Sequence, residues 1–157
     1  MASEKYVLIS INKPHTDNIF SGDKGLEWRK KPLPKGLYYV YETKNKGGCG
    51  MVIGEMRITR SIAVDTSDPL EVCLVNSGCV HPVALKKYAN NGTIYANLIQ
   101  NAKRYDEPKQ LGDFNYACDK DPGTDCTLCA ELGLLKCKPV TRPPQSWCYV
   151  EEMNDGK

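Results

Sequence analysis

Apolar residues alternate with polar ones, or run together, in several short stretches of the chain that glycine and proline separate. Such stretches are typical of strands, because successive side chains of a strand point to opposite faces of the sheet. They predict strands over residues 6–11, 25–31, 37–43, 51–64, 93–100 and 146–152. The stretch over 51–64 is long enough for either one strand or two short ones.

Three segments have the start and stop signals of short helices. A helix over 14–20 is predicted, since Pro14 suits its first position and Gly22 suits its C-terminal cap. A second helix is expected to open at 68–71, where S-D-P-L-E carries a pattern like a capping box, and to end near residue 78. A third is expected over 82–89, before an Asn-Asn-Gly stop.

From residue 104 to 145 the chain becomes polar and rich in Asp, Lys, Pro and Cys, and no convincing strand is predicted there. The order of the other elements favours an α+β fold that is mainly β. It is expected to be a small, mostly antiparallel β-barrel with two or three short helices at its ends. We expect a single domain over 1–157, with 104–141 as a cysteine-rich insert before the last strand.

Composition supports an ordinary globular protein, with 41% hydrophobic and 25% charged residues in 157. No apolar run approaches the roughly 20 residues of a membrane span, and the run Y-V-L-I-S-I is too short for a signal-peptide core. The expected location is therefore cytoplasmic, with no membrane partner. The oligomeric state stays open, and a monomer is plausible.

The positive charge of the chain is small in total but is concentrated in one segment. The net charge of +2 is too small to indicate nucleic-acid binding by itself. Residues 22–36, however, hold five cationic and two anionic side chains, a local charge of +3. Such a strip suits a focused anion site, although a solvated edge strand is the simpler interpretation of a charge run.

The segment G-D-K-G-L-E-W-R at 22–29 is the core of this strip. Alternation places Leu26 and Trp28 on the face of the strand that meets the core. The opposite face carries the charged side chains, with Lys24 approaching from the preceding turn; these are Glu27, Arg29 and Lys31. Lysine and arginine suit phosphate, whereas a salt-bridged trio at the surface would contribute little to stability.

The same segment matches the G-x-K-x-x-E-x-R signature of ASCH domains, members of the PUA-like superfamily. The segments Y-V-Y-E-T-K at 39–44, V-I-G-E at 52–55 and R-P-P-Q-S-W-C-Y-V-E-E at 142–152 also resemble ASCH proteins of bacteria and their phages. The resemblance covers about residues 5–100 and 140–152. It implies a PUA-like barrel of about five or six strands, with a cleft lined by the signature residues.

ASCH domains resemble modules that bind RNA or other nucleic acids, and some members are enzymes. One branch hydrolyses N4-acylcytidines with a lysine, a threonine and a distant glutamate, and another member is a ribonuclease. Here Glu27 stands at the position of the threonine, and a carboxylate can serve as a general base but not as a hydroxyl nucleophile. The counterpart of the distant glutamate is open between Glu55 and Glu71.

The resemblance and the charges together favour binding of RNA or a nucleotide-like ligand in a basic cleft. The expected ligand-binding residues are Lys24, Glu27, Arg29, Lys31 and Tyr41, with Tyr39 also able to stack on a base. The alternative is a small hydrolase acting on modified nucleosides or RNA, with proton transfer by Lys24 and Glu27. Whether the protein is an enzyme stays open.

Four of the eight cysteines cluster with the spacing C-x7-C-x2-C-x7-C; they are Cys118, Cys126, Cys129 and Cys137. Four thiolates can hold a structural Zn²⁺, which would order an insert that lacks apolar residues. Four free thiols are the competing interpretation, and Cys148 or His81 could replace one ligand. A third functional hypothesis follows, that of a protein-interaction module stabilised by zinc.

The remaining cysteines and histidines are expected to have structural roles. Cys73 and Cys148 stand among apolar residues, which predicts small buried side chains. His15 and His81 each adjoin a proline at the boundary of an element, where capping or packing is a more common role than catalysis.

Overall fold

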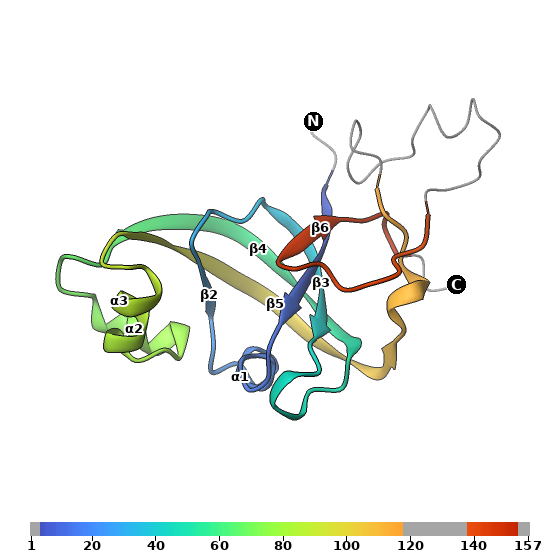
Figure 1. Cartoon of the computed structure of the whole chain (residues 1–157), viewed down its shortest axis with the longest axis horizontal. Helices are drawn as coiled ribbons and strands as arrows, with labels where there is room; N and C mark the ends of the chain where they lie inside the picture. Colours follow the sequence, from blue (N-terminus) through green and yellow to red (C-terminus); the bar gives the residue numbers. More distant parts are fainter. Residues whose placement is uncertain (1–3, 118–137, 154–157) are drawn as a thin grey trace.

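A single mixed sheet organises the protein, whose computed structural model describes residues 4–117 and 138–153 (Figure 1). Six strands follow one another across it in the order β2-β5-β4-β3-β1-β6. The strands are β1 (Tyr6–Ile11), β2 (Leu26–Arg29), β3 (Gly36–Glu42), β4 (Met51–Asp65), β5 (Thr93–Lys109) and β6 (Trp147–Tyr149). The helices are α1 (His15–Ser21), α2 (Val72–Gly78) and α3 (Pro82–Tyr88), with the 3₁₀ turns η1 (Asn45–Gly47) and η2 (Leu111–Asp113).

The mainly β class is confirmed, but the sheet is not a closed barrel. β1 and β3 are parallel and every other pairing of named strands is antiparallel. β2 and β6 stand at opposite ends of the strand order, without pairing to each other in the described chain. Both strands are short, with four residues in β2 and three in β6, and prolines occur nearby in the chain, where the missing N–H cannot donate a ladder hydrogen bond.

Local signals account for two of the three helices. Gly22 caps α1 in the left-handed conformation, with φ of 90°, and its N–H donates to Ile19. At α3, Pro82 takes the first position and the His81 Nδ1 accepts a hydrogen bond from the Val83 N–H. The predicted capping role of His81 is thus confirmed. No helix of the described residues is long and apolar enough to cross a membrane.

The predicted start of the second helix is wrong. α2 begins at Val72, after an extended Glu71 that makes no side-chain cap. The Asp65 carboxylate instead accepts hydrogen bonds from the N–H and the hydroxyl of Ser67. Asp68, the N-cap that the sequence pattern predicts, belongs to this turn, because its N–H donates to the Asp65 carbonyl at 3.3 Å, and the helix begins only at Val72.

β5 is longer than its apolar pattern indicates. The strand continues from the predicted segment to Lys109, and it pairs with β4 as far as Val52. Its outer half is mostly exposed and carries charged side chains, so it lacks the alternation that marks a half-buried strand. The expectation that no strand lies beyond residue 104 is wrong, and residues 104–109 of the proposed insert belong to the sheet.

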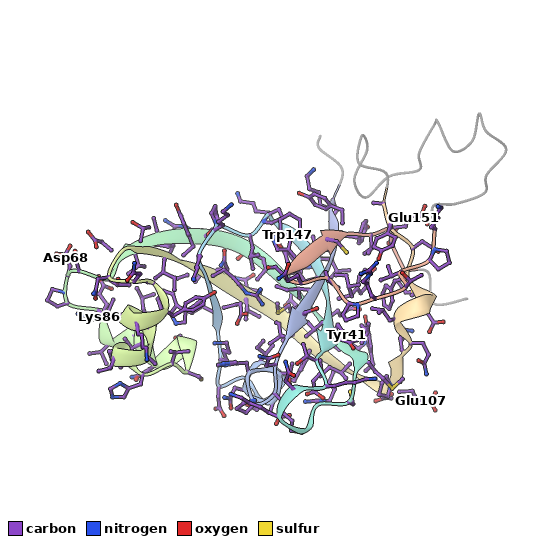
Figure 2. All side chains as sticks on the ribbon, in the orientation of Figure 1. Tyr41, Asp68, Lys86, Glu107, Trp147 and Glu151 are labelled. Carbon is purple, nitrogen blue, oxygen red and sulfur yellow. The ribbon has the colours of Figure 1, made fainter. Side chains whose placement is uncertain are left out.

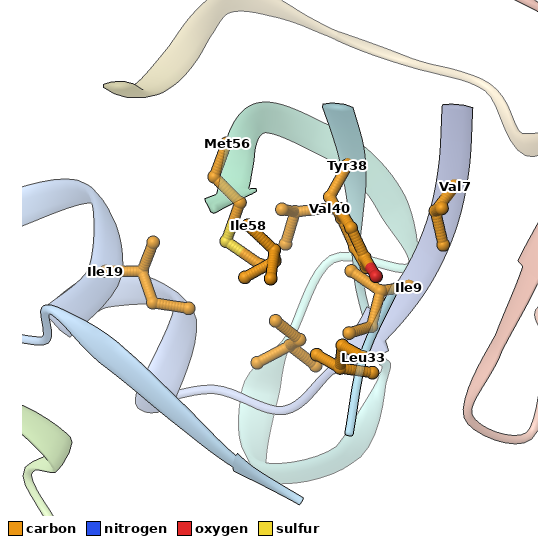
Figure 3. Close-up of a cluster of buried hydrophobic side chains, with 9 residues drawn as sticks. Val7, Ile9, Ile19, Leu33, Tyr38, Val40, Met56 and Ile58 are labelled. Carbon is orange, nitrogen blue, oxygen red and sulfur yellow. The ribbon is translucent and has the colours of Figure 1, made fainter. Parts of the chain in front are cut away.

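The apolar residues form three clusters along the sheet. In the first, Ile19 of α1 packs against β1, β3 and β4, as Figure 3 shows. The second surrounds Tyr39 and Phe114 near the C-terminal segment. The third joins Leu26 and Trp28 to α3, which confirms that this pair of β2 faces the core. Cys73 is exposed, contrary to prediction, whereas Cys148 is half-buried against the second cluster.

Candidate functional site

The two edges of the curled sheet approach each other at Arg29. This side chain belongs to β2, at one end of the strand order, yet its guanidinium reaches the other end. Nη2 donates to the Ser10 carbonyl of β1 at 3.1 Å, and Nη1 donates to the Ser146 hydroxyl, just before β6, at 3.0 Å. Arg29 therefore bridges by side-chain contacts the seam that backbone pairing leaves open.

A pocket of about 930 Å³, which we call the seam pocket, lies along this seam. Its walls come from the end of β1 and the start of α1, from β2, from the turn before η1, from α3 and from the segment before β6. The lining residues are Ser10, Ile11, Asn12, His15, Lys24, Glu27, Trp28, Arg29, Tyr41, Thr43, Lys44, Asn45, Val80, Ala84, Leu85, Tyr88, Pro143, Pro144 and Gln145. Polar residues and an apolar α3 wall therefore share one cavity.

Three charges form a chain in the pocket wall. Glu27 is only 7% exposed and lies between two cations. Its Oε2 accepts from the Arg29 Nε at 2.9 Å and lies 2.8 Å from Nη2, while its Oε1 is 3.7 Å from the Lys24 Nζ. The trio carries a net charge of +1, and the fork of Arg29 is occupied by the protein itself. Arg29 thus orients Glu27 rather than presenting a free phosphate clamp.

Lys24 is an unusual residue to find 2% exposed. Its ammonium donates to the Gly78 carbonyl, at the end of α2. Burial lowers the pKa of Lys24, and the nearby Glu27 carboxylate opposes that shift. The site therefore holds a lysine whose charge is less favourable than in water, a property shared with lysines that transfer protons.

His15 also lines the pocket, a placement that the sequence does not indicate. Its Nδ1 is buried and has no hydrogen-bond partner among the described residues. Burial lowers the pKa of His15, and the positive charge of Lys24 lowers it further. At neutral pH the imidazole is consequently uncharged, and its Nδ1 is shielded from solvent.

Gly78 fits this arrangement because it lacks a side chain. A Cβ at this position would lie 2.0 Å from the Trp28 Nε1, so the indole packs directly on the glycine. The same residue supplies the carbonyl that accepts from Lys24. Gly78 thereby sets the positions of both Trp28 and Lys24.

Two hydroxyl groups of the lining already donate their protons within the protein. The Ser10 hydroxyl donates to the Pro144 carbonyl at 2.7 Å. The Thr43 hydroxyl donates to the Asn12 side-chain oxygen at 2.5 Å. Neither hydroxyl is paired with a general base, as an activated nucleophile requires.

The structure brings together four of the five predicted ligand residues. Lys24, Glu27, Arg29 and Tyr41 all line the pocket, and Figure 2 labels Tyr41 on β3. Lys31 is exposed and lies outside that lining.

Tyr39 is on the same strand as Tyr41 but has a structural contact. Its hydroxyl accepts a hydrogen bond from the Met153 N–H at 2.8 Å, and its ring packs in the second cluster. The α3 wall of the pocket is a further part that the sequence analysis missed. Its one signal is the helical spacing of Ala84 and Tyr88, which places both on one face of α3.

The predicted zinc ligands Cys118, Cys126, Cys129 and Cys137 lie outside the described residues. Within 4–117 and 138–153, no group of three His, Cys, Asp or Glu side chains is arranged to hold a metal ion. Of the two proposed substitute ligands, His81 caps α3. Burial raises the pKa of the Cys148 thiol to about 11, which disfavours the thiolate that binds zinc.

No protein-family model matches the sequence, and no curated protein does. Solved structures do match. The ASCH protein of Zymomonas mobilis superposes with a TM-score of 0.62 over 94% of this chain and 88% of its own, at 19% identity. The protein has the ASCH fold.

Two mutants of the Zymomonas mobilis ASCH protein match equally well. One carries a serine-to-alanine substitution and superposes with a TM-score of 0.62, at 18% identity, over 95% of this chain and 90% of its own. The other carries a tyrosine-to-phenylalanine substitution, with a TM-score of 0.61, 18% identity and coverage of 93% and 90%. The ASCH fold thus extends over nearly the whole chain.

Within this ASCH fold, Glu27 is the only carboxylate among the lining residues of the pocket. Glu55 accepts a hydrogen bond from the Tyr105 hydroxyl, and Glu71 precedes α2. Neither glutamate lines the pocket, so neither fills the place of a second acidic group there.

Proposed function

We propose that the seam pocket binds a nucleotide-like ligand, either a free nucleotide or a nucleotide within RNA, with its base inside the cavity. The observation that carries the proposal is the Lys24–Glu27–Arg29 chain of charges in the wall of a 930 Å³ pocket. This volume is within the range typical of small-molecule sites. An apolar wall that faces fixed polar groups is also what a nucleobase requires.

The chemistry of each wall suits one part of such a ligand. Glu27 can accept a hydrogen bond from a base amino group or a ribose hydroxyl, and His15 contributes an uncharged imidazole to the wall. Tyr41 provides aromatic surface for a base. The phosphate is assigned to Lys44 at the mouth, because Arg29 is already engaged with Glu27.

The test is equilibrium binding of the four ribonucleoside monophosphates and four RNA homotetramers to matched lysine variants. Lys24→Met keeps the apolar stem but removes the charge, and it should weaken binding of the best ligand about tenfold or more. Lys31→Met removes an exposed charge from the adjoining chain and should have little effect beyond a small change in salt dependence. Equal affinities of Lys24→Met and the parent protein, with both folded, would reject the pocket as the binding site.

A second function, hydrolysis of a modified nucleoside or of RNA, is favoured by one specific contact. The buried Lys24 Nζ lies 3.7 Å from the Glu27 Oε1, so an ammonium and a carboxylate face the same part of the pocket wall, although the gap exceeds the roughly 2.6–3.2 Å of direct proton transfer. Because the Ser10 and Thr43 hydroxyls are engaged, the nucleophile would be water activated by Glu27. Lys24 would then stabilise the developing negative charge or return the proton to the leaving group.

This second function predicts turnover of N4-acylcytidines or of RNA that Glu27→Gln abolishes while ligand binding persists. Glutamine preserves the shape of the side chain and can still accept from Arg29, so a loss of turnover alone would report a lost general base. Turnover that survives Glu27→Gln, or no turnover of either substrate class by the parent protein, would contradict the hydrolase mechanism.

A further inference from the structure

Tyr88 is an aromatic residue that core packing does not explain. It is the last residue of α3 and is 45% exposed, although it lines the mouth of the seam pocket. The helix is held in place by Leu85, which is 1% exposed in the third cluster. The ring of Tyr88 is therefore left as a surface at the rim.

A cation already occupies one face of this ring. The Lys30 Nζ lies 4.9 Å from the centroid of Tyr88, in a cation–π contact, and Lys30 follows β2 directly. Lys87 is exposed beside Tyr88 on α3, and Figure 2 labels Lys86 on the same helix. In the described chain no carboxylate is within ion-pair distance of Lys30 or Lys87. The rim thus combines an accessible ring with cations that have no anionic partner there.

The two lysines of α3 have a structural explanation, but Lys30 does not. Cations in the last turn of a helix interact favourably with its dipole, which accounts for Lys86 and Lys87. Lys30 belongs to another segment, and its position over the ring comes from the fold. An exposed aromatic face with nearby cations is the usual platform for a base and its phosphate in single-stranded nucleic acid.

We infer that Tyr88 and Lys30, which we call the rim platform, form a second nucleotide subsite that adjoins the seam pocket. The ligand is then a single strand of RNA with two or more nucleotides rather than a free mononucleotide. One base enters the pocket, the neighbouring base stacks on Tyr88 in place of Lys30, and Lys30 faces the linking phosphate. This inference rests on the proposed function and adds the class of ligand to it.

The experiment compares affinities for each 5′-mononucleotide and the corresponding RNA homotetramer. If the platform binds a base, the best tetramer should bind about tenfold more tightly than its mononucleotide, because one stacked base contributes on that order. Tyr88→Ala should remove this gain, so that tetramer affinity falls by more than mononucleotide affinity, whereas Tyr88→Phe should keep the gain. Lys30→Ala should reduce the slope of log K against log salt by about 0.7, the effect of one single-strand phosphate.

Val83→Ala is the matched control, since Val83 is 70% exposed on the same helix and does not line the pocket. Equal affinity for tetramer and mononucleotide, or a tetramer affinity unchanged in Tyr88→Ala, would overturn the platform while leaving the pocket proposal intact. Failure of every mononucleotide and tetramer to bind would overturn the pocket proposal, and the platform with it. The two failures are therefore distinguishable.

Discussion

At the scale of a single residue, Glu27 differs from a carboxylate in a surface ion pair because it is buried in the wall of the seam pocket. A carboxylate that is 7% exposed needs partners, because burying an unpaired charge is costly. Arg29 and Lys24 supply them from two sides. The lengths of the contacts also separate their roles, since two Arg29 nitrogens lie within 2.9 Å of the Glu27 Oε2 and fix the carboxylate, whereas the more distant Lys24 completes its environment.

Gly78 gives a sharp prediction at this scale. Gly78→Ala should lower the free energy of unfolding by roughly 1–3 kcal/mol, because the new methyl group would overlap the Trp28 indole and approach the Leu26 Cδ1 at 2.9 Å. Gly112→Ala is the control, since nothing lies within 4 Å of its Cβ position, and its effect should stay within about 0.5 kcal/mol. Urea unfolding measures both, and equal stabilities would contradict the close packing of Trp28 on Gly78.

His15 predicts a pH dependence of stability. Its pKa is lower in the folded protein than the 6.5 of an exposed histidine, mainly through burial. The stabilisation from its neutral form is present above that ordinary pKa and is lost as the pH falls through the folded pKa. His15→Gln, which cannot be protonated, should therefore show a smaller loss of thermal stability between pH 7 and pH 5.

Thermal unfolding of both proteins across that range is the measurement. Glu42 does not interfere, because hydrogen bonds from Thr16 and Cys49 outweigh burial and hold its pKa below its ordinary 4.5, beneath the range tested. Parallel pH profiles for the parent protein and His15→Gln would rule out His15 as a source of the acid sensitivity.

At the scale of elements, β2 is joined to the β1 and β6 edge of the sheet by hydrogen bonds of the Arg29 side chain and not by strand pairing. Arg29→Met removes the bridge from β2 to β1 and to the segment before β6, and it leaves Glu27 with Lys24 alone. We expect a loss of roughly 2–3 kcal/mol in the free energy of unfolding. Adding Glu27→Gln to this variant should increase the loss, because the buried Lys24 then has no anionic partner.

Arg57 provides the comparison for that prediction. It pairs with Glu4 at the surface, where its side chain is 42% exposed, so Arg57→Met should cost less than about 1 kcal/mol. Denaturant unfolding of the three variants would show whether the seam contributes as proposed. A similar cost for Arg29→Met and Arg57→Met would mean that the bridge adds no more than a surface ion pair.

The elements also show where sequence patterns are informative. Alternation located β1 and β2, because each of these strands packs apolar side chains in the core. Alternation does not locate the outer half of β5, because this half is held by hydrogen bonds to β4 and does not bury one face in the core. The start of α2 was missed for another reason, since Asp68, the expected N-cap, is part of the turn that Asp65 and Ser67 form.

The candidate site was predictable around β2 and at Tyr41 of β3, and not beyond them. Lys24, Glu27 and Arg29 are close in the sequence, so one turn and one strand define their relation. The placement of His15 and Tyr88 depends on how α1 and α3 pack against that strand, and on the curl of the sheet. No local pattern contains that information, because those contacts join segments far apart in the chain.

At the scale of the whole molecule, a structural zinc site in the cysteine cluster stays a prediction. The spacing of Cys118, Cys126, Cys129 and Cys137 leads us to expect about one zinc ion per chain by elemental analysis. Cys126→Ser/Cys129→Ser should lose it, and Cys73→Ser/Cys79→Ser, in the helical region around α2, should not. Folded parent protein that contains no zinc would reject the site, and with it the zinc-stabilised interaction module.

The pairing of β6 with β1 has a consequence for how the protein is made. Val7 faces Tyr149 across the sheet, and Ser10 donates to Pro144 across 134 residues of sequence. One wall of the pocket and one edge of the sheet are therefore completed by segments that leave the ribosome long after β1. Nascent chains that stop before residue 143 lack this wall, so the capacity to bind a ligand should arise late in synthesis and in a single step.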